Sequence, residues 1–254
     1  MRPFKPGWMN RAVAALALGV LLTAGLSAQQ QPASPAPDAA PKPGPAKAFI
    51  KDFGKDQAAI WKSPFRPSRH TLFTRMLPLA AGTATLIVFD PQISRALPNT
   101  PDQIRWSNYV SRMGAVYTLS AVAAVPIIVG TIEKKSAPVS IGRGAALALA
   151  DSLVVGAAMK YTTLRQRPYT GAGNGNFFSG GDSFPSGHAM NSWAVCTALA
   201  NNTHSPKWLK VTSYAVATAV SLSRVSAHQH FAGDVFAGSL IGAWIGYSSV
   251  RQPR

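Results

Sequence analysis

Three short strings in the second half of this 254-residue chain hold the side chains that are able to do chemistry. They bring together three cations, two histidines, one carboxylate and a glycine turn. Such a set can hold a phosphate group, attack its phosphorus and protonate the group that leaves. The strings are Lys160 with Arg167-Pro168, then Pro185-Ser186-Gly187-His188, and then Ser223-Arg224 with His230 and Asp234.

His230 and Asp234 are four positions apart at the start of a predicted helix, so they lie on one face of it. A carboxylate one turn from an imidazole can accept one ring N–H. That bond would fix the tautomer and leave the other ring nitrogen as a nucleophile. The alternative is a solvated pair of the kind that is common and weak on exposed helix surfaces.

His188 follows a tight turn that opens the next predicted helix. The N–H groups of Ser186, Gly187 and their neighbours would point out of the helix start, which makes an anion site. His188 could then donate a proton to a leaving oxygen and afterwards activate water. The alternative is an ordinary capping turn followed by an incidental histidine.

Lys160, Arg167 and Arg224 supply positive charge for the same chemistry. Phosphoryl transfer spreads negative charge over three equatorial oxygens, and catalysis consists mostly of placing cations around them. Arginine offers a planar fork that matches two oxygens, and lysine offers a point charge. The alternative for each cation is snorkelling at a membrane edge. Each string is weak alone, but the three in this order on one predicted face form a specific pattern.

Six apolar stretches predict helices, and no alternating pattern typical of strands competes with them. A short amphipathic helix is also predicted over 49–70, where Pro64 and Pro67 end it. The fold class is therefore all-α, a six-helix bundle. The six ranges are 72–89, 108–131, 142–162, 187–201, 208–222 and 232–250.

The helix boundaries place all three strings at one end of this bundle, because they fall at the ends of the third and fifth helices and the starts of the fourth and sixth. Gly238, Gly242 and Gly246 recur at every fourth position, which lets two helices approach closely. Between the first two strings, a glycine-rich loop with Phe177 and Phe178 is either a lid over the site or a flexible connection.

The composition favours a membrane protein or an unusually apolar helical one. Hydrophobic residues make up 47% and charged residues 13% of the chain, against a usual charged share of about 25%. The net charge of +16 favours anionic partners such as phosphate groups or acidic lipids. Nucleic acid is not favoured, because the cations are dispersed and do not interleave with aromatics. The single cysteine, Cys196, cannot form an intrachain disulfide and is read as a small core residue.

The N-terminal part divides into two segments before the helical domain at 48–254. Residues 1–28 have a basic start, an apolar run and small residues at Ser27-Ala28, which is typical of a signal peptide. The alternative is an uncleaved membrane anchor, and both place residue 29 outside the cytoplasm. Residues 29–47 form a linker rich in Pro and Ala.

Only some of the helices are long enough for a bilayer, which needs about 20 mostly apolar residues. Range 114–132 meets this, 235–250 nearly does, and 187–201 and 208–222 are short. Asp151 lies in the middle of the third helix, so it must face the bundle interior if that helix is in lipid.

The sequence leaves the membrane topology open. The end opposite the three strings is basic, and the positive-inside rule would put it in the cytoplasm and the strings outside. Six spans from an exported residue 29 would instead put the strings inside. Either one helix does not cross, with 72–89 and its Pro78 the weakest, or the whole domain lies in the periplasm. The basic residues are Lys134, Lys135, Arg143, Lys207, Lys210, Arg251 and Arg254.

The three strings resemble the signature motifs of the type 2 phosphatidic acid phosphatase and vanadium haloperoxidase superfamily, with no motif residue substituted, over roughly residues 70–250. The resemblance implies an all-helical bundle and a phosphatase that needs no metal or other cofactor. It implies that His230 forms a phosphohistidine, that Asp234 orients it, and that His188 is the general acid and then the base. The residues that would bind phosphate are Lys160, Arg167, Ser186, Gly187 and Arg224.

We therefore expect a phosphatase of the cell envelope with its active site facing the exterior. Its substrate would be a phosphomonoester or diphosphate, on a phosphorylated lipid because the bundle is apolar and the chain basic. One alternative is a periplasmic non-specific acid phosphatase that acts on small soluble phosphate esters. Others are a vanadium-dependent haloperoxidase, since vanadate mimics phosphate, and a non-catalytic anion-binding protein. The sequence does not indicate the particular ester or the oligomeric state.

Overall fold

The computed structural model describes residues 44–65 and 67–251. The predicted signal peptide at 1–28 and nearly all of the linker at 29–47 lie outside these residues. The chain divides into two compact units, residues 1–55 and 56–254, and helix α2 (Pro45–Lys62) runs from the first into the second. A 3₁₀ turn at Ser63–Phe65, which contains Pro64, ends α2 close to where the prolines predicted.

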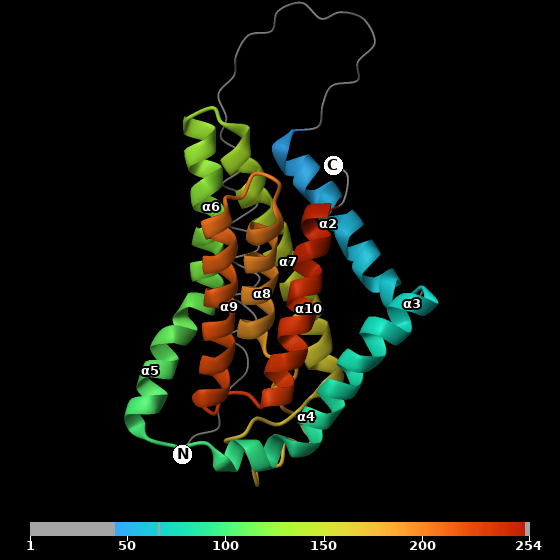
Figure 1. The fold of residues 1–254 in the computed structure, drawn as a ribbon, viewed down its shortest axis with the longest axis vertical. Helices are drawn as coiled ribbons and strands as arrows, with labels where there is room; N and C mark the ends of the chain where they lie inside the picture. The colour runs from blue at the N-terminus through green and yellow to red at the C-terminus, as the bar shows by residue number, and fades with distance from the viewer. Residues whose placement is uncertain (1–43, 66, 252–254) are drawn as a thin grey trace, which may run out of the picture. The chain divides into compact units, whose positions relative to one another are not determined.

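The second unit is built from helices, with no strand among the residues that the structure describes. Figure 1 shows α7, α8, α9 and α10 running alongside one another, with α6 next to α7 and α4 crossing the start of α10. This confirms the all-α prediction. The elements are α3 (Arg69–Thr71), a π-helical turn (Leu72–Met76), α4 (Leu77–Ala96), α5 (Pro101–Ser111), a 3₁₀ turn (Arg112–Gly114), α6 (Val116–Ile132), α7 (Ser136–Thr163), α8 (Gly187–Asn201), α9 (Lys207–Ser226) and α10 (Ala232–Arg251).

The predicted helix at 108–131 is wrong as one element, since the structure has two helices, α5 and α6, with a break between them. The break lies at Gly114, which approaches two other helices. A Cβ on Gly114 would lie 2.5 Å from Cγ1 of Val220 on α9 and 2.6 Å from Oγ of Ser192 on α8. The break therefore lies where the chain packs closely against α8 and α9. The first predicted helix, 72–89, is extended to Ala96 despite Pro91, and the third begins earlier, at Ser136.

Helix α8 is the central element and is buried on two faces. Met190, Ala194 and Ala198 pack in one apolar cluster with residues of α7 and α10, while Val195 and Leu199 pack in another with α6 and α7. A helix surrounded by other helices is apolar all round and has no need to match the thickness of a bilayer. Its short length is thus explained by its place in the core, where Cys196 is also buried, as predicted.

The predicted close approach of the small residues is confirmed, because α10 packs directly on the backbone of α8. A Cβ on Gly238 would lie 2.7 Å from the carbonyl oxygen of Ser186. Those on Gly242 and Gly246 would lie still closer to the carbonyl oxygens of Met190 and Ala194.

Gly242→Ala is therefore expected to destabilise the protein by about 1–3 kcal/mol, because α10 must move away from α8. Thermal unfolding in detergent measures this. The control is Gly54→Ala, since a Cβ there meets nothing within 4 Å in a helix. It is expected to stabilise the helix by up to about 1 kcal/mol. Equal melting temperatures for the two variants would contradict the close contact.

Three helical stretches are long and apolar enough to cross a membrane, namely Arg69–Ala96, Pro101–Ile132 and Ser136–Thr163. The range 114–132 falls in the second stretch, as expected. The range with Pro78 meets the same criterion although it was the weakest by sequence. Asp151 faces the interior, as predicted, where its carboxylate accepts hydrogen bonds from Gln57 Nε2 (2.8 Å) and Ser249 Oγ (3.2 Å).

Candidate active site

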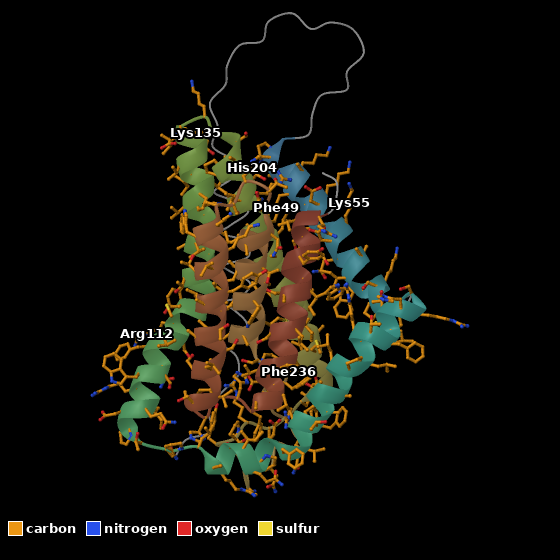
Figure 2. The ribbon with its side chains drawn as sticks, viewed as in Figure 1. Phe49, Lys55, Arg112, Lys135, His204 and Phe236 are labelled. Atoms are coloured by element: carbon orange, nitrogen blue, oxygen red, sulfur yellow. The ribbon has the colours of Figure 1, made fainter. Side chains whose placement is uncertain are left out.

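The three strings meet at one end of the bundle, as their positions in the sequence predict. The loop after α7 and the loop between α9 and α10 lie together at the lower end in Figure 1. The backbone N–H of Ser186 donates to the carbonyl oxygen of Asp234 (3.0 Å), which joins the second string to the third. Figure 2 shows Lys135 and His204 at the other end.

His230 is held by Ser183 and not directly by Asp234. Its Nδ1 lies 2.8 Å from the carbonyl oxygen of Ser183 and 3.7 Å from Oδ2 of Asp234, which is beyond hydrogen-bond distance. The ring N–H therefore donates to Ser183, and this corrects the expectation of a direct bond. The assigned tautomer carries its proton on Nδ1 and a lone pair on Nε2, as the proposed nucleophile requires.

Asp234 acts on His230 through space and through Ser183. The hydroxyl of Ser183 donates to Oδ2 of Asp234 (2.5 Å) and lies 3.4 Å from Nδ1 of His230. The backbone N–H of Phe231 also donates to Oδ2 (3.0 Å). Asp234 is completely buried, so its charge can stabilise a cationic ring that forms beside it.

The pKa of His230 is lowered to about 3, mainly because the ring is buried, with Arg167 and Lys160 adding positive charge nearby. Asp234 opposes this shift but does not outweigh it. The ring is therefore neutral at neutral pH, so that its Nε2 lone pair is available to attack.

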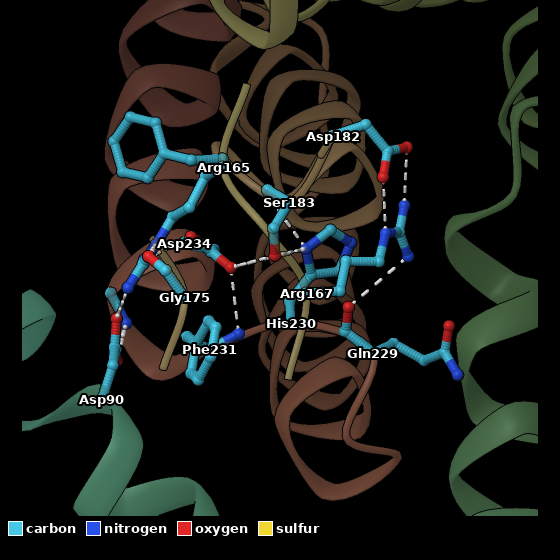
Figure 3. A network of polar contacts seen from close by, with 12 residues as sticks. Asp90, Arg165, Arg167, Gly175, Asp182, Ser183, Gln229, His230, Phe231 and Asp234 are labelled. Carbon is cyan, nitrogen blue, oxygen red and sulfur yellow. Dashed lines mark hydrogen bonds and ion pairs between the residues drawn. The ribbon is translucent and has the colours of Figure 1, made fainter. Parts of the chain in front are cut away.

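Two of the predicted phosphate-binding cations, Arg167 and Lys160, are engaged by Asp182. The guanidinium of Arg167 donates from Nε and Nη2 to the two carboxylate oxygens of Asp182 (2.7 and 2.9 Å), as Figure 3 shows. Lys160 donates to the backbone carbonyl of Asp182, and its Nζ lies 3.9 Å from the carboxylate. Burial alone would raise the pKa of Asp182, but the hydrogen bonds and charge of Arg167 lower it to about 2. The carboxylate of Asp182 thus pairs with the two cations that were predicted to bind phosphate.

Two other predicted phosphate-binding residues carry buried polar atoms without a hydrogen-bond partner in the part of the chain that the structure describes. These atoms are Oγ of Ser186 and Nε of Arg224. The Nη1 of Arg224 donates to Ser111 Oγ (3.0 Å). The N–H of Ser186 is already used by Asp234, so its hydroxyl is the group available to an anion. Buried unpartnered polar groups are costly, and each of these two could donate a hydrogen bond to an oxyanion.

His188 and Gly187 lie at the start of α8, beside the cations. A Cβ on Gly187 would be 3.8 Å from Cε of Lys160. The pKa of His188 is lowered to about 4, first because the ring is largely buried and then because of the positive charges of Arg224, Arg167 and Lys160. The electric fields of Arg167 and Lys160 thus act on both histidines.

Four residues of the site were missed by the sequence analysis. Arg165 lies between Lys160 and Arg167 in the first string, and its position there was the available signal. Asp182, one of few acids in the second half of the chain, follows a Gly-Gly pair. Ser183 and Asp90 carried no signal, because neither belongs to a string and only the fold brings them to the site.

The loop between α7 and α8 packs against the end of α7. The N–H of Gln166 donates to the carbonyl of Asn176 (2.9 Å), and that of Phe178 donates to Thr163 (2.8 Å). Gly175 has a φ of 66°, and a Cβ there would lie 2.5 Å from the ring of Phe231. The loop forms a wall of the site that presents Asp182 and Ser183.

Comparisons with known proteins show which family this chain resembles. The profile of the PAP2 superfamily matches residues 142–254. An undecaprenyl-diphosphatase of Sulfolobus acidocaldarius is 30% identical over 148 residues, which are 56% of this chain and 67% of that protein. A lipid A 1-phosphatase of Porphyromonas gingivalis is 35% identical over 91 residues, 35% of this chain and 18% of that protein.

A solved structure has the same fold. It is a transmembrane PAP2-type phosphatidylglycerolphosphate phosphatase from Bacillus subtilis, with a TM-score of 0.51 and 21% identity over 80% of this chain and 92% of that one. At this identity the likeness concerns the fold alone.

Fold, site and relatives together define a hydrolase of phosphoric esters. The chain belongs to the PAP2 superfamily.

Proposed function

We propose that this protein removes a phosphate group from a membrane lipid, either a phosphomonoester or a diphosphate, through a phosphohistidine on His230. The observation that carries the proposal is the buried His230, whose Nδ1–H donates to the carbonyl oxygen of Ser183 and whose ring lies within the electric fields of Arg167 and Lys160. Two relatives are named for phosphatase activity on lipids, an undecaprenyl diphosphate and lipid A. The apolar helices of the chain support a lipid substrate.

The first step of the proposed reaction forms the intermediate. Nε2 of His230 attacks phosphorus, and the bond from phosphorus to the leaving oxygen breaks. His188 gives its proton to that oxygen. Lys160, Arg167, Arg224, Ser186 and Gly187 surround the equatorial oxygens, and Asp234 stabilises the cationic ring.

The second step releases phosphate. His188, now neutral, takes a proton from water, whose oxygen attacks phosphorus, and the bond to Nε2 breaks. His188 must be protonated when substrate binds, although its pKa is about 4 without it. A phosphate dianion offsets the charges of the three cations and therefore raises this pKa. The cations of the chain supply the charge that a metal supplies in other phosphatases, so we propose that no metal is needed.

The test is phosphate release by purified full-length protein in detergent with EDTA. Phosphatidic acid, an isoprenoid diphosphate and a small aryl phosphate are compared. We expect activity in EDTA, with a higher kcat/KM for one of the lipids than for the aryl phosphate. A protein inert toward all three would refute the function, and a preference for the aryl phosphate would favour a non-specific acid phosphatase.

We also propose that the protein is integral to the cell envelope, with the site facing the exterior. Three apolar stretches support this arrangement, and so do the basic residues at the ends of the helices opposite the site. A carbonate wash of membranes is expected to leave the protein in the pellet. Its release without detergent would indicate a soluble or peripheral enzyme.

Asp182→Asn is expected to strengthen inhibition by inorganic phosphate by about tenfold, because the carboxylate competes with phosphate for Arg167 and Lys160. The inhibition constant of phosphate measures this. The control is Asp102→Asn, since Asp102 pairs with Arg105 (3.0 Å) on the exposed surface. Weaker phosphate inhibition in Asp182→Asn would mean that Asp182 chiefly orients Arg167.

A further inference from the structure

The guanidinium of Arg165 is buried, and each of its three nitrogens donates a hydrogen bond. Its side chain is 1% exposed. Nε donates to the carbonyl of Gly175 (3.0 Å), Nη1 to Oδ1 of Asp234 (2.6 Å) and Nη2 to Oδ2 of Asp90 (2.9 Å). The rings of Phe177 and Phe231 lie 4.8 and 4.6 Å from its carbon Cζ. Figure 3 shows Arg165 between the two carboxylates.

Asp90 brings α4 to this network. Of the residues of α4, all of which the structure describes, Asp90 alone is buried. Its Oδ1 accepts a hydrogen bond from the N–H of Gly233 at the start of α10 (2.8 Å). A Cβ on Gly233 would lie 2.7 Å from Oδ2 of Asp90, so a side chain there would push the carboxylate away. The carboxylate of Asp90 is therefore closely fitted against the start of α10.

Ion pairs connect Asp90 through Arg165 to Asp234, the carboxylate beside His230. Oδ1 of Asp234 is held by Arg165, while Oδ2 is held by Ser183 and Phe231. These contacts fix the plane of the carboxylate and the 3.7 Å between Oδ2 and Nδ1 of His230. The single positive charge of Arg165 is divided between the carboxylates of Asp90 and Asp234. It therefore neutralises the charge of Asp234 less than it would if Asp234 were its only partner. The mechanism proposed above uses neither Asp90 nor Arg165, and burying three charges is costly unless they are paired.

We propose that Asp90 and Arg165 are positioning residues that hold Asp234 in the place and charge state from which it orients His230. Through Asp90, the docking of α4 on α10 becomes a condition for turnover. Because α4 belongs to the candidate membrane-spanning stretch Arg69–Ala96, the catalytic pair is linked to one of the three helical stretches that are apolar enough to cross a membrane. This inference rests on the proposed function.

The test compares Asp90→Asn and Arg165→Met with wild type as full-length proteins in detergent. Both side chains keep nearly the same size, while the charge is lost. We expect kcat to fall at least tenfold in Asp90→Asn and about a hundredfold in Arg165→Met, as displaced catalytic groups do. KM and the Kd of vanadate, a phosphate mimic, should stay within about twofold, because the residues proposed to bind phosphate are untouched. Asp102→Asn is the control and should match wild type.

The pH profile separates positioning from a structural role. The groups that act on the ring of His230 are Lys160 on α7, Arg167 and Asp182 on the following loop, and Asp234 on α10. Loss of the negative Asp90 should move the acid limb of kcat/KM to lower pH. Loss of the positive Arg165 should move it to higher pH. A defect in folding alone gives no such opposite shifts.

Turnover is expressed per vanadate-binding site, so that a partly unfolded preparation is not counted as a catalytic loss. An Asp90→Asn protein with wild-type kcat and an unmoved acid limb would overturn the positioning role while leaving the proposed function intact. A wild-type protein that releases no phosphate from any ester would instead refute the function, and this role with it.

Discussion

His230→Ala is expected to abolish phosphate release, with kcat falling by about 1,000-fold or more. The variant lacks the atom that attacks phosphorus, and none of the cations around the site can replace it. The residues proposed to bind phosphate are intact, so the Kd of vanadate should change much less than kcat. The measurement is phosphate release from phosphatidic acid, together with vanadate binding to the same preparation.

His228→Asn is the matched control for this variant. His228 lies two residues earlier, and its Nε2 is 3.0 Å from the carbonyl oxygen of Pro98. It has a φ of 52°, a conformation that asparagine tolerates well. His228→Asn should keep kcat within a few-fold of wild type. If His230→Ala retained a kcat within tenfold of that control, His230 would not be the nucleophile.

His188→Ala is expected to have the second largest effect, and the loss should depend on the leaving group. With a lipid alcohol, which leaves poorly without a proton, kcat should fall by about 100-fold to 10,000-fold. With an aryl phosphate the first step needs little protonation, so it remains fast. The second step still lacks its base. The phosphohistidine should therefore accumulate, seen as a rapid burst of aryl alcohol close to one equivalent per active site.

Wild-type protein under the same conditions should show no such accumulation if His188 activates the water. Rapid-mixing absorbance of the released aryl alcohol measures both proteins. Equal losses on lipid and aryl substrates without a burst would remove His188 from both proton transfers. It would then be a residue that binds phosphate.

The sequence predicts those parts of the molecule that depend on local pattern. Range 187–201 was predicted as a helix from its apolar residues and the preceding Pro-Ser-Gly turn, and α8 has the same bounds. Gly238, Gly242 and Gly246 predicted a close helix contact because small residues at this spacing have few other uses. The three strings also meet as expected, because they fall where α7 and α9 end and where α8 and α10 begin, at the same end of the bundle.

The features that were missed depend on tertiary contacts that no local pattern encodes. The i,i+4 spacing predicted His230 and Asp234 on one helix face, but α10 begins only at Ala232, so His230 lies in the loop before it. The spacing also cannot indicate that the hydroxyl of Ser183 lies between the two side chains. Arg167 was predicted to bind phosphate, whereas in the structure it donates a hydrogen bond to Asp182 of the following loop. The break between α5 and α6 lies at Gly114, where α8 and α9 pack closely against the chain, and the sequence did not indicate it. Asp90 is separated from the third string by most of the domain, and only the fold brings Arg165 and Gly233 against its carboxylate.

The most direct test of the account is to locate the covalent phosphate during turnover. Full-length protein is mixed with aryl phosphate, quenched in alkali within the burst, digested and analysed by peptide mass spectrometry. We expect one phosphoryl group on His230, more of it in His188→Ala than in wild type, and none in His230→Ala. Continued turnover with no phosphoryl group on His230, or with the group on another residue, would contradict the account.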